Sequence, residues 1–140
     1  MKNIVLATAI SALMAAPAMA ESVKIGFMTT LSGGAGVIGK QQQNAVNLAM
    51  EHKANTLGGF DAEVIFVDDQ RKPDVAKQLA NRLIKSDRVD VIAGVIWSNL
   101  LMAVHKQVTR SDTLLISANA GPSPLAAVSY THLRAHETVM

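Results

Sequence analysis

Hydroxyl side chains and glycines follow an apolar run near the start of the chain, an arrangement suited to holding a small polar or anionic group. The run VKIGFM (23–28) leads into TTLSGG (29–34). Hydroxyls and free backbone amides at a strand-to-helix turn can bind a carboxylate, helped by the positive end of the helix dipole. Ser32 is therefore a candidate ligand-binding residue. The alternative is a loop whose glycines serve only to turn the chain.

The glycine spacing in this turn does not favour a nucleotide. A Walker loop requires Gly-Lys followed by Ser or Thr, and that sequence does not follow here. The letters GAGVIG (34–39) fit G-x-G-x-x-G, but they start six residues past the predicted strand and no acidic ribose partner is evident. We therefore favour a small polar ligand over a nucleotide.

Two adjacent carboxylates, Asp68 and Asp69, end a second apolar run, VIFV (64–67). Such a pair could bind a divalent metal, as in a phospho-acceptor receiver domain. That chemistry needs a third acidic group and a lysine at other strand ends, which carry Ser/Gly, Trp-Ser-Asn and Asn-Ala-Gly instead. We therefore predict no metal and no cofactor. We interpret the pair as a solvated turn in which an aspartate caps the helix beginning at Pro73.

Two further polar turns follow later apolar runs. Trp97, the only tryptophan, offers a flat apolar wall beside polar amides. Plain core packing is the alternative for Trp97, and an N-cap role is the alternative for Ser98. Asn119 brings donor and acceptor groups, and its small neighbours let a ligand approach the backbone. The candidate ligand-binding residues of these two turns are Trp97, Ser98, Asn99, Asn119, Ala120 and Gly121.

Composition and side-chain placement exclude several other functions. The chain has no cysteine, which rules out disulfide and zinc-thiolate frameworks. Its formal net charge is +2 and its charges are spread along the sequence, so we predict no nucleic-acid partner. His52 and His105 lie on predicted helices remote from the polar turns. Because no serine, histidine and carboxylate converge, we do not expect an enzyme.

A regular alternation of strands and helices must position the four polar turns. The strands, each a short apolar run, are predicted over 23–28, 62–67, 90–93 and 113–117. The helices are predicted over 39–53, 73–84 and 98–109. This alternation predicts a three-layer α/β fold, a parallel sheet with helices on both faces. Right-handed crossovers would then bring all four polar turns to one edge of the sheet.

The amino-terminal 20 residues have the features of an export signal. Lys2 supplies a positive start, an apolar stretch follows over 4–16, and Ala18-Met19-Ala20 fits a small-x-small cleavage site. A membrane anchor is the alternative, but the stretch is too short to span hydrocarbon. We therefore expect residues 1–20 to be cleaved and the mature protein to be periplasmic.

The carboxyl-terminal 13 residues differ from the rest of the chain. After residue 127 the apolar periodicity ends, and VSYTHLRAHET (128–138) resembles the translation of a transposase-type sequencing adapter. A short native tail is the alternative. We interpret 128–140 as an adapter artefact and expect one truncated domain over 21–127.

Five segments together resemble the amino-terminal lobe of periplasmic solute-binding proteins of ABC importers, in the branched-chain amino acid (Leu/Ile/Val-binding) family. They are VKIGFMTTLSGGAGVIG (23–39), QNAVNLAMEHKANTLGG (43–59), EVIFVDDQRKPDVAKQLANRLI (63–84), AGVIWSN (93–99) and LLISANAGPSP (114–124). The resemblance implies a type I periplasmic binding protein lobe, one of two hinged lobes that close around a solute and present it to permease subunits in the inner membrane.

The resemblance also implies roles for individual residues. Ser98 falls where a hydroxyl contacts the ligand's carboxylate. Asn119 and Gly121 fall where a backbone carbonyl and a threonine-type hydroxyl serve the ligand, and Ile38 where an aromatic side chain can lie over it. This sequence departs from that pattern, because Gly121 has no hydroxyl and Ile38 is not aromatic.

These departures bear on the solute. Arg71 and Trp97 occupy two positions that some relatives join by a disulfide, and ISANAGPSP (116–124) resembles members that bind other carboxylates, aromatic acids among them. We therefore predict a substrate-binding component of an ABC transporter for a branched-chain amino acid or related small carboxylate. The alternative is the ligand-sensing ectodomain of a signalling receptor. A receiver-like or nucleotide-binding domain conflicts with the export signal.

Overall fold

A five-stranded sheet forms the centre of the fold in a computed structural model that describes residues 22–125. The predicted segments 1–20 and 128–140 lie outside these residues. The strands are β1 (Ser22–Thr29), β2 (Thr56–Leu57), β3 (Phe60–Asp68), β4 (Val91–Gly94) and β5 (Leu114–Ser117). The helices are α1 (Gly36–His52), α2 (Pro73–Arg82), the π-helical segment η1 (Leu83–Asp87) and α3 (Ser98–Val108).

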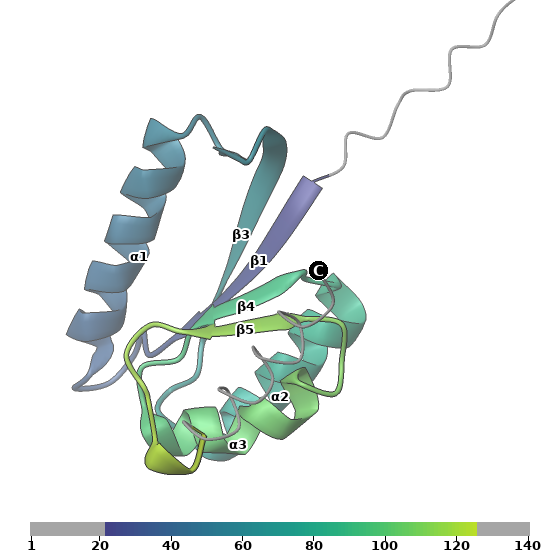
Figure 1. Cartoon of the computed structure of the whole chain (residues 1–140). Coiled ribbons are helices and arrows are strands. Elements are labelled where there is room, and N and C mark those ends of the chain that lie inside the picture. The colour runs from purple at the N-terminus through teal and green to yellow at the C-terminus, as the bar shows by residue number, and fades with distance from the viewer. Residues whose placement is uncertain (1–21, 126–140) are drawn as a thin grey trace, which may run out of the picture.

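The strand order, β2-β3-β1-β4-β5, explains why helices cover both faces. Strands β3, β1, β4 and β5 are parallel, and only β2 pairs antiparallel, with β3. The chain moves from β1 to β3 in one direction and from β3 through β4 to β5 in the other. Right-handed crossovers in opposite directions place their helices on opposite faces. Accordingly, α1 lies on one face, and α2 and α3 lie together on the other (Figure 1). The three-layer α/β prediction is confirmed.

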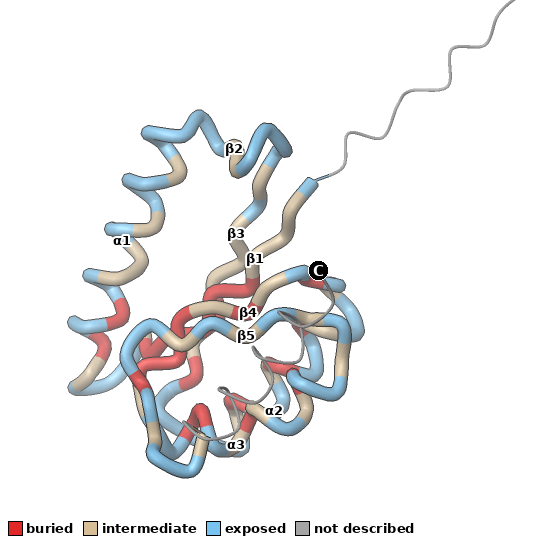
Figure 2. Tube along the Cα trace, viewed as in Figure 1, coloured by how far each residue is buried: buried red, intermediate tan, exposed pale blue. Residues whose placement is uncertain are grey.

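The hydrophobic core lies between the sheet and the α2/α3 layer. Met28 and Ile92 from the strands and Leu83, Leu100 and Val104 from the helical layer are completely buried. Figure 2 shows the buried residues concentrated where β1 and β4 meet α2 and α3. Helix α1 contributes much less, since only its two glycines, Gly36 and Gly39, are buried.

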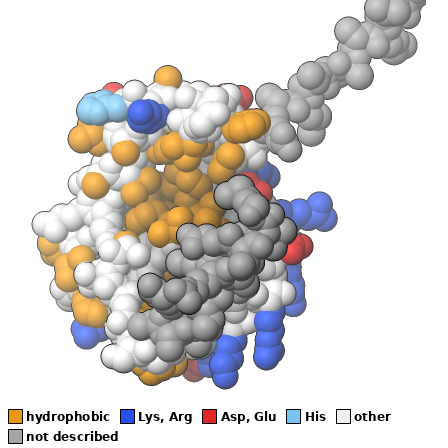
Figure 3. All heavy atoms as spheres, viewed as in Figure 1, with side chains coloured by type: hydrophobic (Ala, Val, Ile, Leu, Met, Phe, Trp, Pro, Cys, Tyr) orange, Lys and Arg blue, Asp and Glu red, His pale blue; other side chains and the backbone are white. Residues whose placement is uncertain are grey.

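The α1 face of the sheet is only partly covered within residues 22–125. Leu115 packs against the core, so its strand neighbours Leu114 and Ile116 point to the opposite face, where they are 58% and 50% exposed. Figure 3 shows hydrophobic side chains gathered on the surface beside α1. None of the helices in residues 22–125 combines the length and hydrophobicity needed to cross a bilayer.

Candidate ligand-binding site

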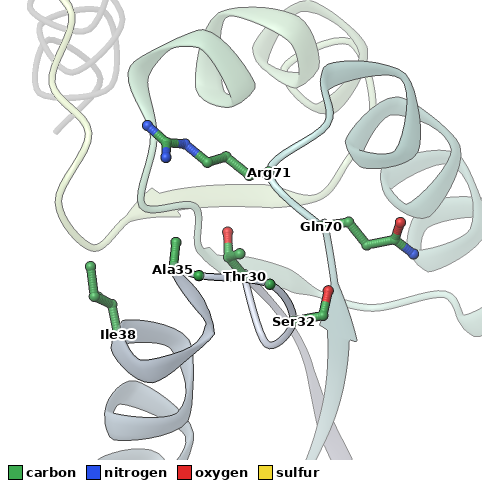
Figure 4. Close-up of a pocket in the computed structure, with 8 residues that line it drawn as sticks. Thr30, Ser32, Ala35, Ile38, Gln70 and Arg71 are labelled. Atoms are coloured by element: carbon green, nitrogen blue, oxygen red, sulfur yellow. The ribbon is translucent and has the colours of Figure 1, made fainter.

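The candidate site lies where the sheet reverses its winding direction. β1 sits between β3 and β4. The connection from β1 leads to β3 on one side, and the connection from β4 leads to β5 on the other side. Open α/β sheets bind ligands in the crevice at such a switch point. Beside this point, the loop after β1 and the loop after its other neighbour, β3, border an open hollow of about 430 Å³ (Figure 4). Its lining residues are Thr30, Ser32, Gly33, Gly34, Ala35, Ile38, Gln70 and Arg71.

Close packing of α1 against the loop after β1 shapes one wall of the hollow. A Cβ at Gly39 would stand 1.8 Å from the carbonyl oxygen of Thr30, so only glycine allows this approach. Thr29 Oγ1 donates a 2.8 Å hydrogen bond to Gln42 Oε1 on α1. The glycines of the GAGVIG segment therefore bring the start of α1, with Ile38, close to the polar turn.

The end of β4 is shaped so that Trp97 reaches the same region. Gly94 adopts φ +99°, and a Cβ there would stand 2.3 Å from the carbonyl oxygen of Met28. The next residue, Val95, donates its N–H to that same carbonyl oxygen at 2.7 Å. This turn brings Trp97 beside the loop that follows β1.

Asp68 holds the turns after β1 and β3 together. Its Oδ1 accepts hydrogen bonds from the backbone N–H groups of Leu31 at 2.8 Å and Gln70 at 2.9 Å. Burial acts to raise the pKa of Asp68, but hydrogen bonds from the Ser32 side chain and from these backbone amides outweigh it, so the pKa falls below the ordinary 3.8. The ionised carboxylate of Asp68 therefore serves to hold the two turns together.

Residues 70–72 of this turn are exposed, as a solvated turn predicts, but Asp69 itself is fully buried, which corrects the prediction for this side chain. Its Oδ1 accepts hydrogen bonds from Thr30 Oγ1 at 2.5 Å and from the N–H of Arg71 at 2.8 Å. The predicted aspartate cap of α2 is also wrong, because the N-cap residue is Lys72 and no side chain caps the helix. The carboxylate stabilises the tight turn before α2 instead. In the described part of the chain, no group of three His, Asp or Glu residues could hold a metal ion.

Trp97 joins this network from β4. Its Nε1–H donates to Thr30 Oγ1 at 2.8 Å, and the guanidinium carbon of Arg71 lies 4.1 Å from the centre of the indole ring. Trp97 also packs against the hydrophobic core while remaining half-buried, so core packing and a place at the site are both observed. The ends of β1, β3 and β4 are thus tied together by side chains.

The predicted site residues fall into two groups. Ser32 and Ile38 line the hollow, and Trp97 borders it through Thr30 and Arg71. The others lie on the neighbouring loops and outside its lining. Ser98 and Asn99 begin α3 and are exposed; Trp97 is the N-cap residue, so the N-cap alternative for Ser98 is wrong.

The loop after β5 holds the last three candidates. Asn119 Nδ2 donates to the carbonyl oxygen of Ile96 at 3.5 Å, which links this loop to the end of β4. Ala120 is buried and its carbonyl oxygen accepts from Ser117 Oγ at 2.6 Å, whereas Gly121 is exposed. The ligand contacts assigned to these residues remain predictions.

Sequence reasoning missed the contribution of the turn after β3. Gln70 and Arg71 line the hollow, and both have positive φ angles, 51° and 57°, which non-glycine residues rarely adopt. The sequence did carry one usable signal: Arg71 follows the second predicted strand closely, and the predicted sheet brings the turns after all strands to one edge.

A parallel α/β lobe with a polar hollow at its switch point is the architecture of a solute-binding lobe. The model of the family described as "Periplasmic binding protein" matches residues 22–138. The chain belongs to this family.

Known relatives agree with this assignment. The chain is 30% identical over 131 residues to Leu/Ile/Val-binding protein homolog 6 of Brucella abortus, covering 92% of this chain and 34% of that protein. It therefore spans about a third of the length of the curated relatives that it matches. A Rhodopseudomonas palustris solute-binding protein solved with 3,4-dihydroxybenzoic acid is 35% identical, with TM-score 0.69 over 73% of this chain and 28% of that one. A branched-chain amino acid binding protein of Streptococcus pneumoniae solved with isoleucine is 25% identical, with TM-score 0.68 over 75% and 31%.

Proposed function

We propose that this chain is the amino-terminal lobe of an extracytoplasmic, non-catalytic solute-binding protein of an ABC importer, and that its solute is a small carboxylate. The observation that carries the proposal is the hollow at the switch point, lined by hydroxyls, glycines and a single charged side chain, Arg71. Two similar proteins were solved with isoleucine and with 3,4-dihydroxybenzoic acid, and both of these molecules carry a carboxylate.

The proposed mechanism is closure of two lobes around the solute. The relatives are about three times as long as this chain, which leaves room for a second lobe opposite the hollow. A solute that bridges both lobes stabilises the closed form, because it gains contacts there that the open form lacks. The closed protein would then deliver its solute to permease subunits, after export through the signal in residues 1–20.

Calorimetry on the full-length protein tests the proposal. The natural gene is recovered from its source, and the purified protein is titrated with leucine, isoleucine, benzoate and 3,4-dihydroxybenzoate. We expect at least one of these carboxylates to bind with a micromolar or lower dissociation constant. Leucinol and benzyl alcohol, which lack the carboxylate, serve as matched controls and should bind at least tenfold more weakly. A folded protein that binds none of the four carboxylates would contradict the proposed function.

A further inference from the structure

Arg71 is held in place by a closed set of contacts between three strand ends. The buried carboxylate of Asp69 accepts hydrogen bonds from Thr30 Oγ1 and from the N–H of Arg71. Thr30 Oγ1 in turn accepts from Trp97 Nε1, and the Arg71 guanidinium lies 4.1 Å from the centre of the Trp97 ring. A cation at this distance from an indole ring is attracted by the negative face of the ring. The side chain is therefore preorganised.

The stacked guanidinium is available to a ligand. It is planar, and stacking on a ring occupies its face while leaving the N–H groups along its edge able to donate to a carboxylate. Within residues 22–125 no hydrogen bond or ion pair of this guanidinium is found. Figure 4 shows the Arg71 side chain extending over the loop toward the side of Ile38, whereas the Gln70 side chain points away.

The two aspartates nearby do not offer an equivalent site for a cation. Asp68 is held by the amides of Leu31 and Gln70, and Asp69 by Thr30 and the amide of Arg71. The second oxygen of Asp69, Oδ2, has no hydrogen-bond partner in the described residues, but it is buried and so out of reach of a ligand in the hollow. Within residues 22–125, the lining of the hollow therefore carries a positive charge and suits an anionic group.

We propose that Arg71, stacked on Trp97, donates hydrogen bonds to the carboxylate of the solute. The exposed side chain of Ile38 provides an apolar surface on the same side of the hollow for the body of such an acid. This assignment rests on the proposed function and names the side chain of this lobe that pairs with the charge of the solute.

The test is calorimetry on the full-length protein with benzoate and leucine as probes. Both probes carry a carboxylate, and the one that the protein binds more tightly is used. Arg71→Ala should weaken binding of that carboxylate about 10- to 100-fold, the range expected for a hydrogen-bonded ion pair. Arg71→Lys keeps the positive charge but lacks the planar guanidinium group with its paired N–H donors. It should therefore restore only part of the lost affinity.

Controls separate binding from folding. Arg110→Ala makes the same chemical change in the exposed turn after α3, at the opposite edge of the sheet, and should leave binding unchanged. Thermal unfolding checks that each variant is folded, and Arg71→Gln replaces Arg71→Ala if the latter is not. Carboxylate binding unaffected by loss of Arg71 would overturn the assignment and leave the solute-binding function intact. Absence of binding to any carboxylate would instead remove the proposed function itself.

Discussion

The hydroxyl of Thr30 accepts one hydrogen bond and donates another, so it connects two other side chains of the site. It receives the Trp97 indole N–H and gives its proton to Asp69, with both partners at hydrogen-bonding distance. Thr30 itself is 1% exposed, so no water can replace either bond without a local opening. Loss of this hydroxyl should therefore affect the fold as well as the position of Trp97.

We expect Thr30→Val to lower the free energy of unfolding by about 2 kcal/mol, since it preserves shape, leaves the indole N–H of Trp97 unpaired and removes one of the two hydrogen bonds to the buried Asp69 Oδ1. Urea denaturation of the purified protein measures the change. Thr56→Val is the matched control, because the Thr56 hydroxyl donates only to the exposed carbonyl oxygen of Lys53, and should cost less than about 0.5 kcal/mol. Equal effects of the two substitutions would show that the hydroxyl of Thr30 is not important.

The lowered pKa of Asp68 makes its contribution dependent on pH. The folded-state pKa lies below the ordinary 3.8, so the ionised carboxylate stabilises the fold at pH values above 3.8, and this contribution is lost as the pH falls through the folded-state pKa. Asp68→Asn should cost about 1 kcal/mol at pH 7, allowing for solvent screening at this partly exposed site, and almost nothing near pH 2. Thermal unfolding from pH 7 to pH 2 gives the difference. A gap that stays constant with pH would contradict this account.

At the scale of elements, α1 is placed by steric fit more than by hydrophobic burial. Its apolar residues Leu48 and Ala49 are exposed. Its buried residues are Gly36 and Gly39, at the end next to the hollow. The contact between this helix and the loop after β1 thus depends on the absence of a side chain.

We expect Gly39→Ala to destabilise the protein by about 2 kcal/mol or more and to displace the start of α1, because the added Cβ would collide with the backbone of Thr30. Gly34→Ala is the matched control in the same segment, since a Cβ there meets nothing within 4 Å. Urea midpoints of the two variants provide the comparison. Equal midpoints would show that α1 can shift without cost.

The sequence predicted the elements well and the site only in part. Continuous apolar strands and the crossover rule suffice to place β1, β3, β4 and β5 and the edge at which their turns meet. The short hairpin strand β2 was missed, because its two residues carry no periodicity and Gly58-Gly59 indicates only a break. Arg71 was missed as a lining residue because its position depends on a left-handed turn held by a buried carboxylate, which no local pattern reveals.

At the scale of the whole molecule, the sheet face on the α1 side is only partly covered in the described residues. Leu114 and Ile116 lie on β5, the edge strand of the sheet. An apolar edge strand with unpaired backbone groups favours association between chains. We expect the 140-residue chain to self-associate at micromolar concentrations, as measured by light scattering.

Ile116→Lys should reduce this association severalfold, because it places a charge on the apolar face of the edge strand. Met102→Lys, on the exposed surface of α3, is the control and should have little effect. A wild-type chain that stays monomeric at 100 μM would contradict the prediction.

The open hollow also predicts weak binding by this chain alone. If the solute is held between two lobes, one lobe supplies only part of the contacts, so the 140-residue chain should bind benzoate or leucine no better than at millimolar concentrations. A submillimolar dissociation constant measured by calorimetry on this chain would contradict the two-lobe mechanism. Independent sequencing of the gene beyond codon 127 distinguishes a transport component from the ectodomain of a signalling receptor. A membrane helix after a second lobe would favour sensing over transport.

The pair of hydrogen bonds that runs from Trp97 through Thr30 to Asp69 has an evolutionary consequence. The hydroxyl of Thr30 is the hydrogen-bond partner of both Trp97 and Asp69. A substitution at one of the three positions therefore removes the interaction that favours the present residues at the other two. In an alignment of homologues, we expect the residues at positions 30, 69 and 97 to covary. Homologues with phenylalanine at position 97 should have many residue types at position 30, whereas those that keep tryptophan should retain a hydroxyl residue there.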